Sequence, residues 1–306
     1  MTRFSYRIWH PLLARLPRVP AYKLATLGGY WRARSASREQ VAIVDGLRQA
    51  FPTLDTSALA QRAASLPRLL ARETQDVFRL PHADAASIAA LIRMDGFSHY
   101  RRACESDRPV ILYSAHFSRL IMPAIALALR GGPIHSLVTD IEDVEMSTTE
   151  RDYLRFKLDN MGRLLGGDVI ARGRDTRALF KVLSGGGTLV IIVDAPAAEG
   201  DQPIAVPFLG GTGRFSPGIL KLARRYNAQL LPYFAVEREG RLCGEVHAPV
   251  EIAGLDDPAA MLAIMAPVER MIRRHPEQWW MWPHLHAVWS PPSITTALDS
   301  PVEVEN

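Results

Sequence analysis

An apolar run that ends in a histidine starts at residue 110 and reads Val110-Ile111-Leu112-Tyr113-Ser114-Ala115-His116-Phe117-Ser118-Arg119-Leu120. The run predicts a buried strand that carries His116 at its carboxyl end, just before an apolar helix over residues 120–129. Ligands of open α/β sheets gather at that edge. An imidazole there can take a proton at neutral pH, because its ordinary pKa is about 6.5. The competing interpretation is that His116 caps the following helix.

Helical patterns and short apolar segments divide the rest of the chain. Its 306 residues, 48% of them hydrophobic, suffice for a large core. Helical periodicity extends from residue 39 to about residue 102. Further strands are predicted over residues 134–138, 166–170, 188–193, 229–235 and 242–249, and helices over 140–160, 178–183, 219–226 and 257–274. This order predicts an α/β fold with a mixed, largely parallel central sheet flanked by helices, and a helical N-terminal portion.

A carboxylate follows the most apolar of these predicted strands. Residues 188–193 lead directly into Asp194. Because the carboxyl ends of neighbouring parallel strands share one edge, Asp194 is expected on the same side as His116. There it could orient the imidazole or hold a substrate amine. The alternative is that Asp194 accepts backbone N–H bonds in the turn that follows.

The first forty residues are strongly basic. Their charged residues are Arg3, Arg7, Arg15, Arg18, Lys23, Arg32, Arg34 and Arg38, against Glu39 alone, and aromatic and leucine residues lie between them. This pattern is typical of a segment that lies on an anionic membrane surface. Nucleic-acid binding and a solvated helix face are the alternatives, but no nucleic-acid motif accompanies the arginines. Prolines and arginines interrupt every apolar stretch before the ~18 residues that a spanning helix needs. We also expect no cleaved signal peptide.

Three arginines precede the predicted helix over residues 178–183. Arg172, Arg174 and Arg177 stand where a helix already carries positive partial charge, so an anion such as a phosphate or phosphopantetheine group would explain them. Alternatively, they pair with the acidic run over residues 140–145. That run lacks the spacing of a calcium-binding loop, and two distant cysteines give no zinc or disulfide motif. We expect no metal and no cofactor.

The order of these motifs resembles the bacterial lipid A biosynthesis acyltransferases (lauroyl and myristoyl transferases) of the lysophospholipid acyltransferase-like superfamily. The resemblance extends from about residue 20 to residue 290. Its segments are Ala115-His116-Phe117, Arg174-Asp175-Thr176-Arg177, Asp194 with Val206-Pro207-Phe208-Leu209-Gly210, Leu222-Ala223-Arg224 before Pro232, and Pro276-Glu277-Gln278-Trp279 with Trp282. It implies a glycerolphosphate acyltransferase-like domain over residues 41–290 (helical 41–107, α/β 108–290). Residues 1–40 would form the membrane-associating segment, and residues 291–306 a disordered tail.

The resemblance also implies a reaction. His116 would deprotonate a hydroxyl or amine, which attacks a fatty acyl thioester of acyl carrier protein or coenzyme A without an acyl-enzyme. The implied location is peripheral, on the cytoplasmic face of the bacterial inner membrane. Nucleic acid is not an expected partner.

One position departs from the family. The family's histidine is followed, five positions on, by an orienting Asp or Glu, and residue 121 here is an isoleucine. Candidate replacements are Asp194, Glu199 and Glu142, with Asp194 preferred because it ends the central strand. Arg119 is a new cation near His116, which could favour the neutral base or contact an anionic acceptor. The residues expected to contact substrate are Phe117, Arg119, Arg174, Arg177 and Glu199.

Two functions therefore compete. The first is an O- or N-acyltransferase with His116 as general base and Asp194 as its acid. The second is a catalytically inactive relative that binds acyl lipids or recruits a partner, which the isoleucine at 121 favours. A hydrolase, with water in place of the acceptor, is a weaker third possibility. An acidic oxygen within about 3 Å of a His116 ring nitrogen would support the enzyme.

Overall fold

The computed structural model describes residues 2–35, 37–142, 144–197 and 200–292. It confirms the α/β fold. The larger of two sheets has the strand order β1-β9-β8-β2-β5-β3-β4, and every neighbouring pair is parallel except β8 and β9. Its strands are β1 (Ile92–Asp95), β2 (Val110–Ser114), β3 (Ile134–Val138), β4 (Gly166–Ala171), β5 (Thr188–Ile192), β8 (Gln229–Arg238) and β9 (Arg241–Val246).

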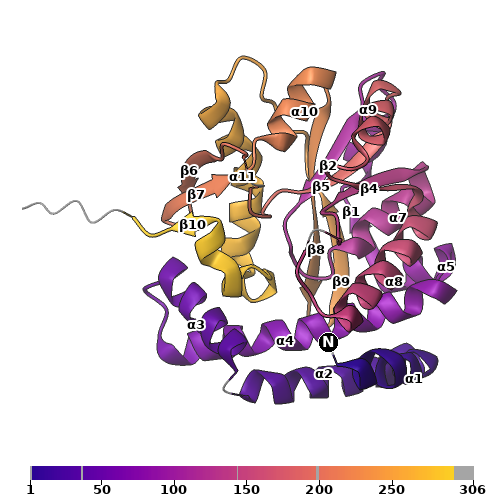
Figure 1. Ribbon diagram of the computed structural model, residues 1–306, viewed down its shortest axis with the longest axis vertical. Helices are drawn as coiled ribbons and strands as arrows, with labels where there is room; N and C mark the ends of the chain where they lie inside the picture. The colour runs from indigo at the N-terminus through magenta and orange to yellow at the C-terminus, as the bar shows by residue number, and fades with distance from the viewer. Residues whose placement is uncertain (1, 36, 143, 198–199, 293–306) are drawn as a thin grey trace, which may run out of the picture.

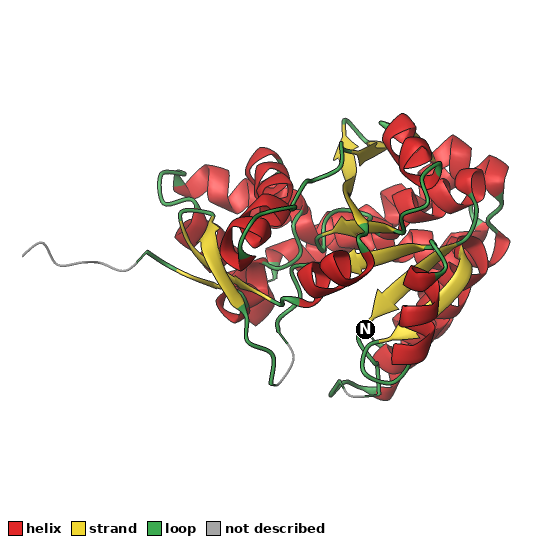
Figure 2. Ribbon diagram, turned by 90° about the horizontal axis from the view of Figure 1, so that it is seen from above, coloured by secondary structure: helices red, strands yellow, loops and turns green. Residues whose placement is uncertain are grey.

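Helices cover both faces of this sheet (Figures 1 and 2). The α-helices of the described residues are α1 (His10–Arg15), α2 (Arg18–Arg34), α3 (Arg38–Ala50), α4 (Thr56–Arg79), α5 (Ala85–Leu91), α6 (Phe97–Cys104), α7 (Ile121–Gly131), α8 (Thr148–Leu165), α9 (Thr176–Ser184), α10 (Gly218–Tyr226) and α11 (Asp257–Arg274). Figure 1 shows α7 and α8 on one side of the sheet, α11 on the other, and α2 and α4 beneath one end. A smaller antiparallel sheet lies beyond α11 and has the order β10 (Trp289–Ser290), β7 (Gly211–Phe215), β6 (Ile204–Phe208).

Strand β2 explains why both faces need helices. All five of its residues are buried, and successive side chains point to opposite faces. Ile111 and Tyr113 join the apolar cluster beneath α11, whereas Val110 and Leu112 join the cluster beneath α7. A strand buried on both faces is apolar throughout, which is the pattern that the sequence displays.

Three sequence predictions were wrong in detail. The helix expected over residues 81–102 is interrupted by β1, which extends the sheet beside β9. The helix expected from residue 140 begins only at Thr148, because Ser147 caps it in a reciprocal pair with Glu150. The periodicity of residues 257–274 predicts Leu262 on the inward side with Met261, Met265 and Met271, and this is wrong, because Leu262 is 41% exposed. The predicted disordered tail falls almost wholly outside the described residues.

The N-terminal helices present an apolar surface to solvent. Their exposed large apolar side chains are Phe4, Ile8, Trp9, Leu12, Leu16, Val19, Leu24, Leu27, Trp31 and Val41. Within the described residues, no helix combines the length and apolar character that crossing a membrane requires. We refer to this set of side chains as the N-terminal apolar face.

His10 ties α1 to α4. Its ring stacks on Phe78 with centroids 5.3 Å apart, and its Nδ1 lies 2.6 Å from Nε2 of the buried Gln75. Burial, assisted by the charge of Arg32, lowers the pKa of His10 to about 4. The folded chain therefore holds a neutral imidazole at pH values where the unfolded chain binds a proton.

This shift predicts a pH-dependent stability. As the pH falls from 6.5 towards 4, His10 becomes protonated in the unfolded chain but stays neutral in the folded chain. The free energy of unfolding therefore decreases. We expect His10→Gln to remove about 1–3 kcal/mol of that decrease. The lower end of this range applies if solvent reaches the ring, because the ring is only partly buried. Urea unfolding at pH 7 and pH 4.5 measures it. His82→Gln, at an exposed histidine, is the control and should follow the wild type; equal behaviour of all three chains would contradict the prediction.

Candidate active site

His116 and Asp194 meet because β2 and β5 are neighbours in register. Ser114 and Ile192, the last residues of the two strands, are paired, and Val193 N–H donates to the carbonyl of Ser114 at 2.9 Å. His116 and Asp194 each follow their strand end by two residues, at the carboxyl edge of a parallel pair. The prediction that the two residues share this edge is confirmed.

Their contact is direct. Asp194 Oδ1 lies 2.8 Å from His116 Nδ1, and the backbone N–H of His116 donates to both carboxylate oxygens at 3.0 and 2.9 Å. The Asp194 side chain is fully buried, whereas that of His116 is 33% exposed. A proton on Nδ1 that donates to the carboxylate leaves Nε2 as the acceptor for a substrate proton. His116 therefore does not cap α7, whose N-terminal residue has no side-chain cap.

A tryptophan-rich segment holds this pair from the other side. Trp279 Nε1 donates to Asp194 Oδ2 at 2.7 Å. The turn after His116 is fixed by Trp280 N–H, which donates to the carbonyl of His116 at 2.8 Å, and by Ser118 N–H, which donates to the carbonyl of Gln278 at 2.7 Å. Ser118 has φ = +50°, a conformation that costs a non-glycine residue energy and persists where its surroundings impose it. The segment Pro276-Glu277-Gln278-Trp279 is recognisable in the sequence as a motif, but no sequence pattern indicates its contact with Asp194.

Trp279→Phe is expected to lower kcat about ten-fold, because it removes one N–H donor from a buried carboxylate and a hydrogen bond to a charge is worth ~1.5–3 kcal/mol. The matched control is Trp282→Phe. Trp282 is as deeply buried in the same segment, but its Nε1 donates to the carbonyl of Pro276. Both variants lose apolar contacts and a hydrogen bond, so similar kcat values in the two would contradict a specific role for the Trp279 N–H.

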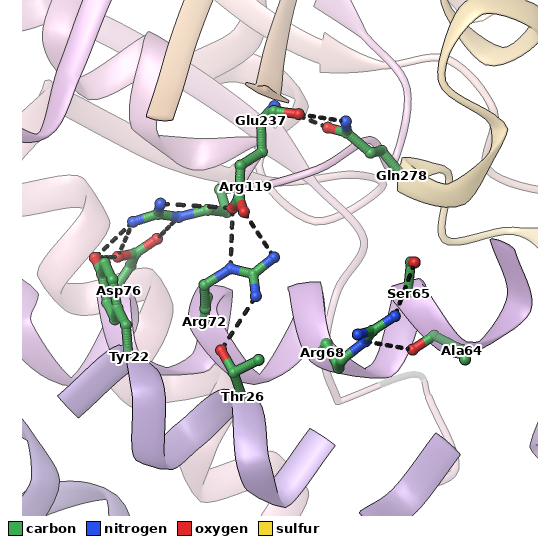
Figure 3. A network of polar contacts seen from close by, with 10 residues as sticks. All are labelled: Tyr22, Thr26, Ala64, Ser65, Arg68, Arg72, Asp76, Arg119, Glu237 and Gln278. Atoms are coloured by element: carbon green, nitrogen blue, oxygen red, sulfur yellow. Dashed lines mark hydrogen bonds and ion pairs between the residues drawn. The ribbon is translucent and has the colours of Figure 1, made fainter. Parts of the chain in front are cut away.

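Arg119, three residues after His116, lies at the centre of a buried polar network (Figure 3). Its side chain is 2% exposed and forms two hydrogen bonds to Asp76 of α4, which is fully buried. Tyr22 of α2 also donates to Asp76, and its hydroxyl accepts from Arg119 Nη2 at 2.5 Å. Burial alone would lower the pKa of Arg119, but Asp76, Tyr22 and Glu237 raise it above its ordinary value.

The network continues to β8 and to the tryptophan-rich segment. Glu237 lies 3.8 Å from Arg119 and accepts from Arg72 of α4 at 2.7 Å. Its backbone exchanges two hydrogen bonds with the side chain of Gln278, at 2.9 and 2.7 Å. The turn after His116 is therefore anchored to α2, α4 and β8 at once. Figure 3 shows these side chains converging from those separate elements.

A family model for the bacterial lipid A biosynthesis acyltransferases matches residues 2–289 of this chain. The chain belongs to that family. The comparison with curated proteins gave no match. Membership implies acyl transfer as the general activity. The matched residues include the N-terminal helices as well as the sheet.

In this acyltransferase-family chain, the residue five positions after His116 does not supply a carboxylate. Ile121 is 4% exposed and begins α7 within the apolar cluster. Asp194 is the acid that contacts the imidazole. Glu142 pairs instead with Arg151 and Arg155, at 3.0 and 2.6 Å. Glu199 lies outside the described residues.

Two of the predicted substrate contacts have protein partners. The guanidinium of Arg119 is directed at Asp76 and Glu237, as described above, and not at a solvent-exposed surface. Phe117 is fully buried and packs edge-to-face on Phe234 with centroids 6.1 Å apart. These positions indicate that both side chains hold the turn in place. Contact of either with substrate stays a prediction that the structure does not support.

The arginines before α9 have mixed surroundings. Arg174 pairs with Asp140 at 3.0 Å, so the alternative of pairing with the acidic run holds for this residue. Arg177 is exposed on the first turn of α9. Arg172 lies on the wall of a cavity of about 390 Å³ that also includes Val193 and Ala195, the two neighbours of Asp194.

That cavity has the composition expected of an acyl-chain site. Its wall is mostly apolar, with residues from the ends of β3, β4 and β5 and from α9 and α10. Lys221 and Arg225 join Arg172 on it. An apolar hollow with a few cations suits a ligand that has a hydrocarbon chain and a phosphate. The described residues contain no group of three or more side chains suited to hold a metal ion.

Another cation lies near the aromatic ring that contacts the imidazole. The ring of Trp280 is tilted against His116 with centroids 6.0 Å apart, and Lys157 of α8 lies 5.5 Å from the centre of the Trp280 ring. Lys157 is paired with the nearly buried Glu73 at 2.6 Å. No sequence pattern indicates the Lys157–Glu73 pair, because its members lie on helices that are distant in the chain.

Proposed function

We propose that this protein transfers a fatty acyl group from an acyl thioester to a hydroxyl or amine of a lipid-like acceptor, with His116 as general base. The observation that carries the proposal is the 2.8 Å contact between His116 Nδ1 and the buried Asp194 carboxylate. A buried carboxylate on one ring nitrogen fixes the tautomer and stabilises the imidazolium that forms when the other nitrogen takes a proton.

That geometry supports the following reaction. The acceptor O–H or N–H gives its proton to His116 Nε2 as its heteroatom bonds to the thioester carbonyl carbon. The resulting tetrahedral species collapses with cleavage of the C–S bond, and the imidazolium returns the proton to the departing thiolate. The products are an acylated acceptor and a free thiol, and no acyl-enzyme forms.

The donor would be acyl carrier protein or coenzyme A, each of which carries phosphate next to the thioester arm. The cavity beside Asp194 supports this assignment, because an apolar wall and the cations Arg172, Lys221 and Arg225 match an acyl chain and a phosphate. The acceptor would approach the exposed side of His116. The ring of Trp280, which is tilted against His116, offers an aromatic surface beside it.

The protein would act at the surface of an anionic membrane. The cytoplasmic side of a bacterial inner membrane fits the reaction. The N-terminal apolar face supports this proposal, since ten large apolar side chains are exposed among basic residues. A helix that lies in the interface buries its apolar side in the lipid and places its cations among anionic headgroups.

Single-turnover transfer tests the proposal. Radiolabelled acyl groups are offered on acyl carrier protein and on coenzyme A to a total bacterial lipid extract, with wild type and His116→Ala. We expect a labelled lipid from the wild type and at least about a 10³-fold slower reaction from His116→Ala, because a general base contributes ~10²–10⁴ and positioning adds to it.

Other outcomes would replace the proposal. Labelled lipid from both proteins at equal rates would exclude His116 as the base. Free fatty acid without an acylated lipid would indicate a hydrolase. Tight acyl binding with no turnover from either donor would favour the inactive lipid-binding relative.

A further inference from the structure

A second cavity, of about 490 Å³, lies between α2, the carboxyl end of α4, α5 and α7. Its apolar wall includes Val19, Leu80, Ile88, Leu91 and Met122. It does not share a wall residue with the cavity beside Asp194. Ligand pockets commonly enclose about 300–1,000 Å³, so it has the size of a ligand site.

This cavity is continuous with the N-terminal apolar face. Val19 belongs to both, being a wall residue that is 61% exposed. Ala14 and Pro17, on the wall, alternate along the chain with the exposed Leu12 and Leu16. The apolar wall of the cavity and the exposed apolar side chains therefore meet at Val19.

The polar part of the wall is cationic. Arg18 and Arg79 line the cavity together with His82. Arg79 Nη2 donates to the carbonyl of Leu16 at 2.6 Å, but its Nε is buried and has no hydrogen-bond partner among the described residues. Arg18 uses Nη1 on the carbonyl of Ala90 and is otherwise exposed. A buried donor without a partner costs free energy that an anionic oxygen would recover.

The acidic residue in the cavity does not cancel this charge. Asp76 is on the wall, but its carboxylate already accepts from Arg119 and Tyr22. The charge that remains for a ligand is therefore positive, from Arg79 and Arg18. The cavity therefore combines an apolar hollow with a cationic mouth that opens at the N-terminal apolar face. These features suit an amphiphilic molecule with a negatively charged headgroup.

We propose that this cavity binds an anionic phospholipid of the supporting membrane, with one acyl chain between α2 and α5 and the phosphate at Arg79 and Arg18. This lipid is not the reacting acyl group, which has its own cavity beside Asp194. The site does not depend on the acyl-transfer proposal, because binding there requires no chemistry at His116. It would tie α1 and α2 to one particular lipid in addition to the general attraction of a basic surface.

Calorimetric titration of the full chain with a short-chain lipid tests this inference without a membrane. The probe is dihexanoyl phosphatidylglycerol below its micelle concentration, compared with dihexanoyl phosphatidylcholine. We expect saturable one-to-one binding of the anionic lipid, and about ten-fold weaker binding of the zwitterionic one, because its choline cation lies beside the same phosphate and is repelled by Arg79 and Arg18.

Two variants on α5 form a matched pair. Ala90 is exposed at the cavity wall, and Ala86 is exposed on the same helix but is not part of it. Ala90→Trp should fill the mouth and weaken binding about ten-fold or more, whereas Ala86→Trp should bind as the wild type does. Arg79→Gln should remove the preference for the anionic lipid. If Arg79→Gln unfolds, the alanine pair still decides the question.

Three results would overturn the inference. The first is no saturable binding of the anionic lipid. The second is equal binding by Ala90→Trp and Ala86→Trp, which would place the lipid elsewhere. The third is displacement of the lipid by octanoyl coenzyme A in the wild type together with loss of octanoyl coenzyme A binding in Ala90→Trp, which would assign the cavity to the acyl donor.

Discussion

Asp194→Asn is expected to reduce kcat by about 10³–10⁴ with little change in KM. The carboxylate touches only the enzyme's own groups, namely His116 and Trp279, so its loss should leave substrate binding intact. An amide of the same shape keeps hydrogen bonds but loses the negative charge that stabilises an imidazolium. It can also impose the wrong tautomer on the histidine, and in serine proteases the same substitution costs about 10⁴.

The matched control for this variant is Asp168→Asn. Asp168 forms the other Asp–His pair of the sheet, with His135 at 3.4 Å, but it is exposed on β4 and away from the strand ends. Single-turnover rates under saturating donor measure both variants. A kcat for Asp194→Asn within about ten-fold of that for Asp168→Asn would show that the Asp194 charge is dispensable.

Arg119→Met is expected to lower the free energy of unfolding by about 3–5 kcal/mol, the usual cost of leaving one member of a buried ion pair behind. The side chains of Arg119 and Asp76 are 2% and 0% exposed, so water cannot replace the lost partner. Because Arg119 lies in the turn that carries His116, activity should fall at temperatures where the chain is still folded. Urea unfolding followed by circular dichroism gives the first quantity.

Two comparisons make this result specific. Arg48→Ala removes an exposed ion pair to Asp45 on α3 and should change stability by no more than about 0.5 kcal/mol. The double variant Asp76→Asn, Arg119→Met should be more stable than Arg119→Met alone, because it no longer buries an unpaired carboxylate. If the double variant loses the sum of the two single losses, the pair is not coupled.

Much of the site was predictable because it depends on strand order. Apolar runs identified β2 and β5, and parallel strands place the residues that follow them on one edge, which brought Asp194 to His116. The same rule favoured Asp194 as the replacement for the acid that is missing at position 121. Helix α11 and the hairpin of β8 and β9 were likewise visible as long periodic or alternating patterns.

The remainder depends on packing between distant segments. Asp76 lies 43 residues before Arg119 on a helix whose pattern gives no sign of its partner. Strand β1 has four residues and is a strand only because β9 lies beside it. Trp279 contacts Asp194 although the two residues are 85 positions apart in the chain. Local periodicity cannot report such contacts, since each is created when the sheet and its helices close on one another.

His116 and Asp194 are expected to act as one unit in acyl transfer, which a double-mutant cycle can test. Single-turnover rates are measured for wild type, His116→Ala, Asp194→Asn and the double variant. If Asp194 works only through the imidazole, the double variant should react about as slowly as His116→Ala alone, as residues that act together lose activity non-additively. Losses that multiply in the double variant would contradict the claim and give the two residues separate roles.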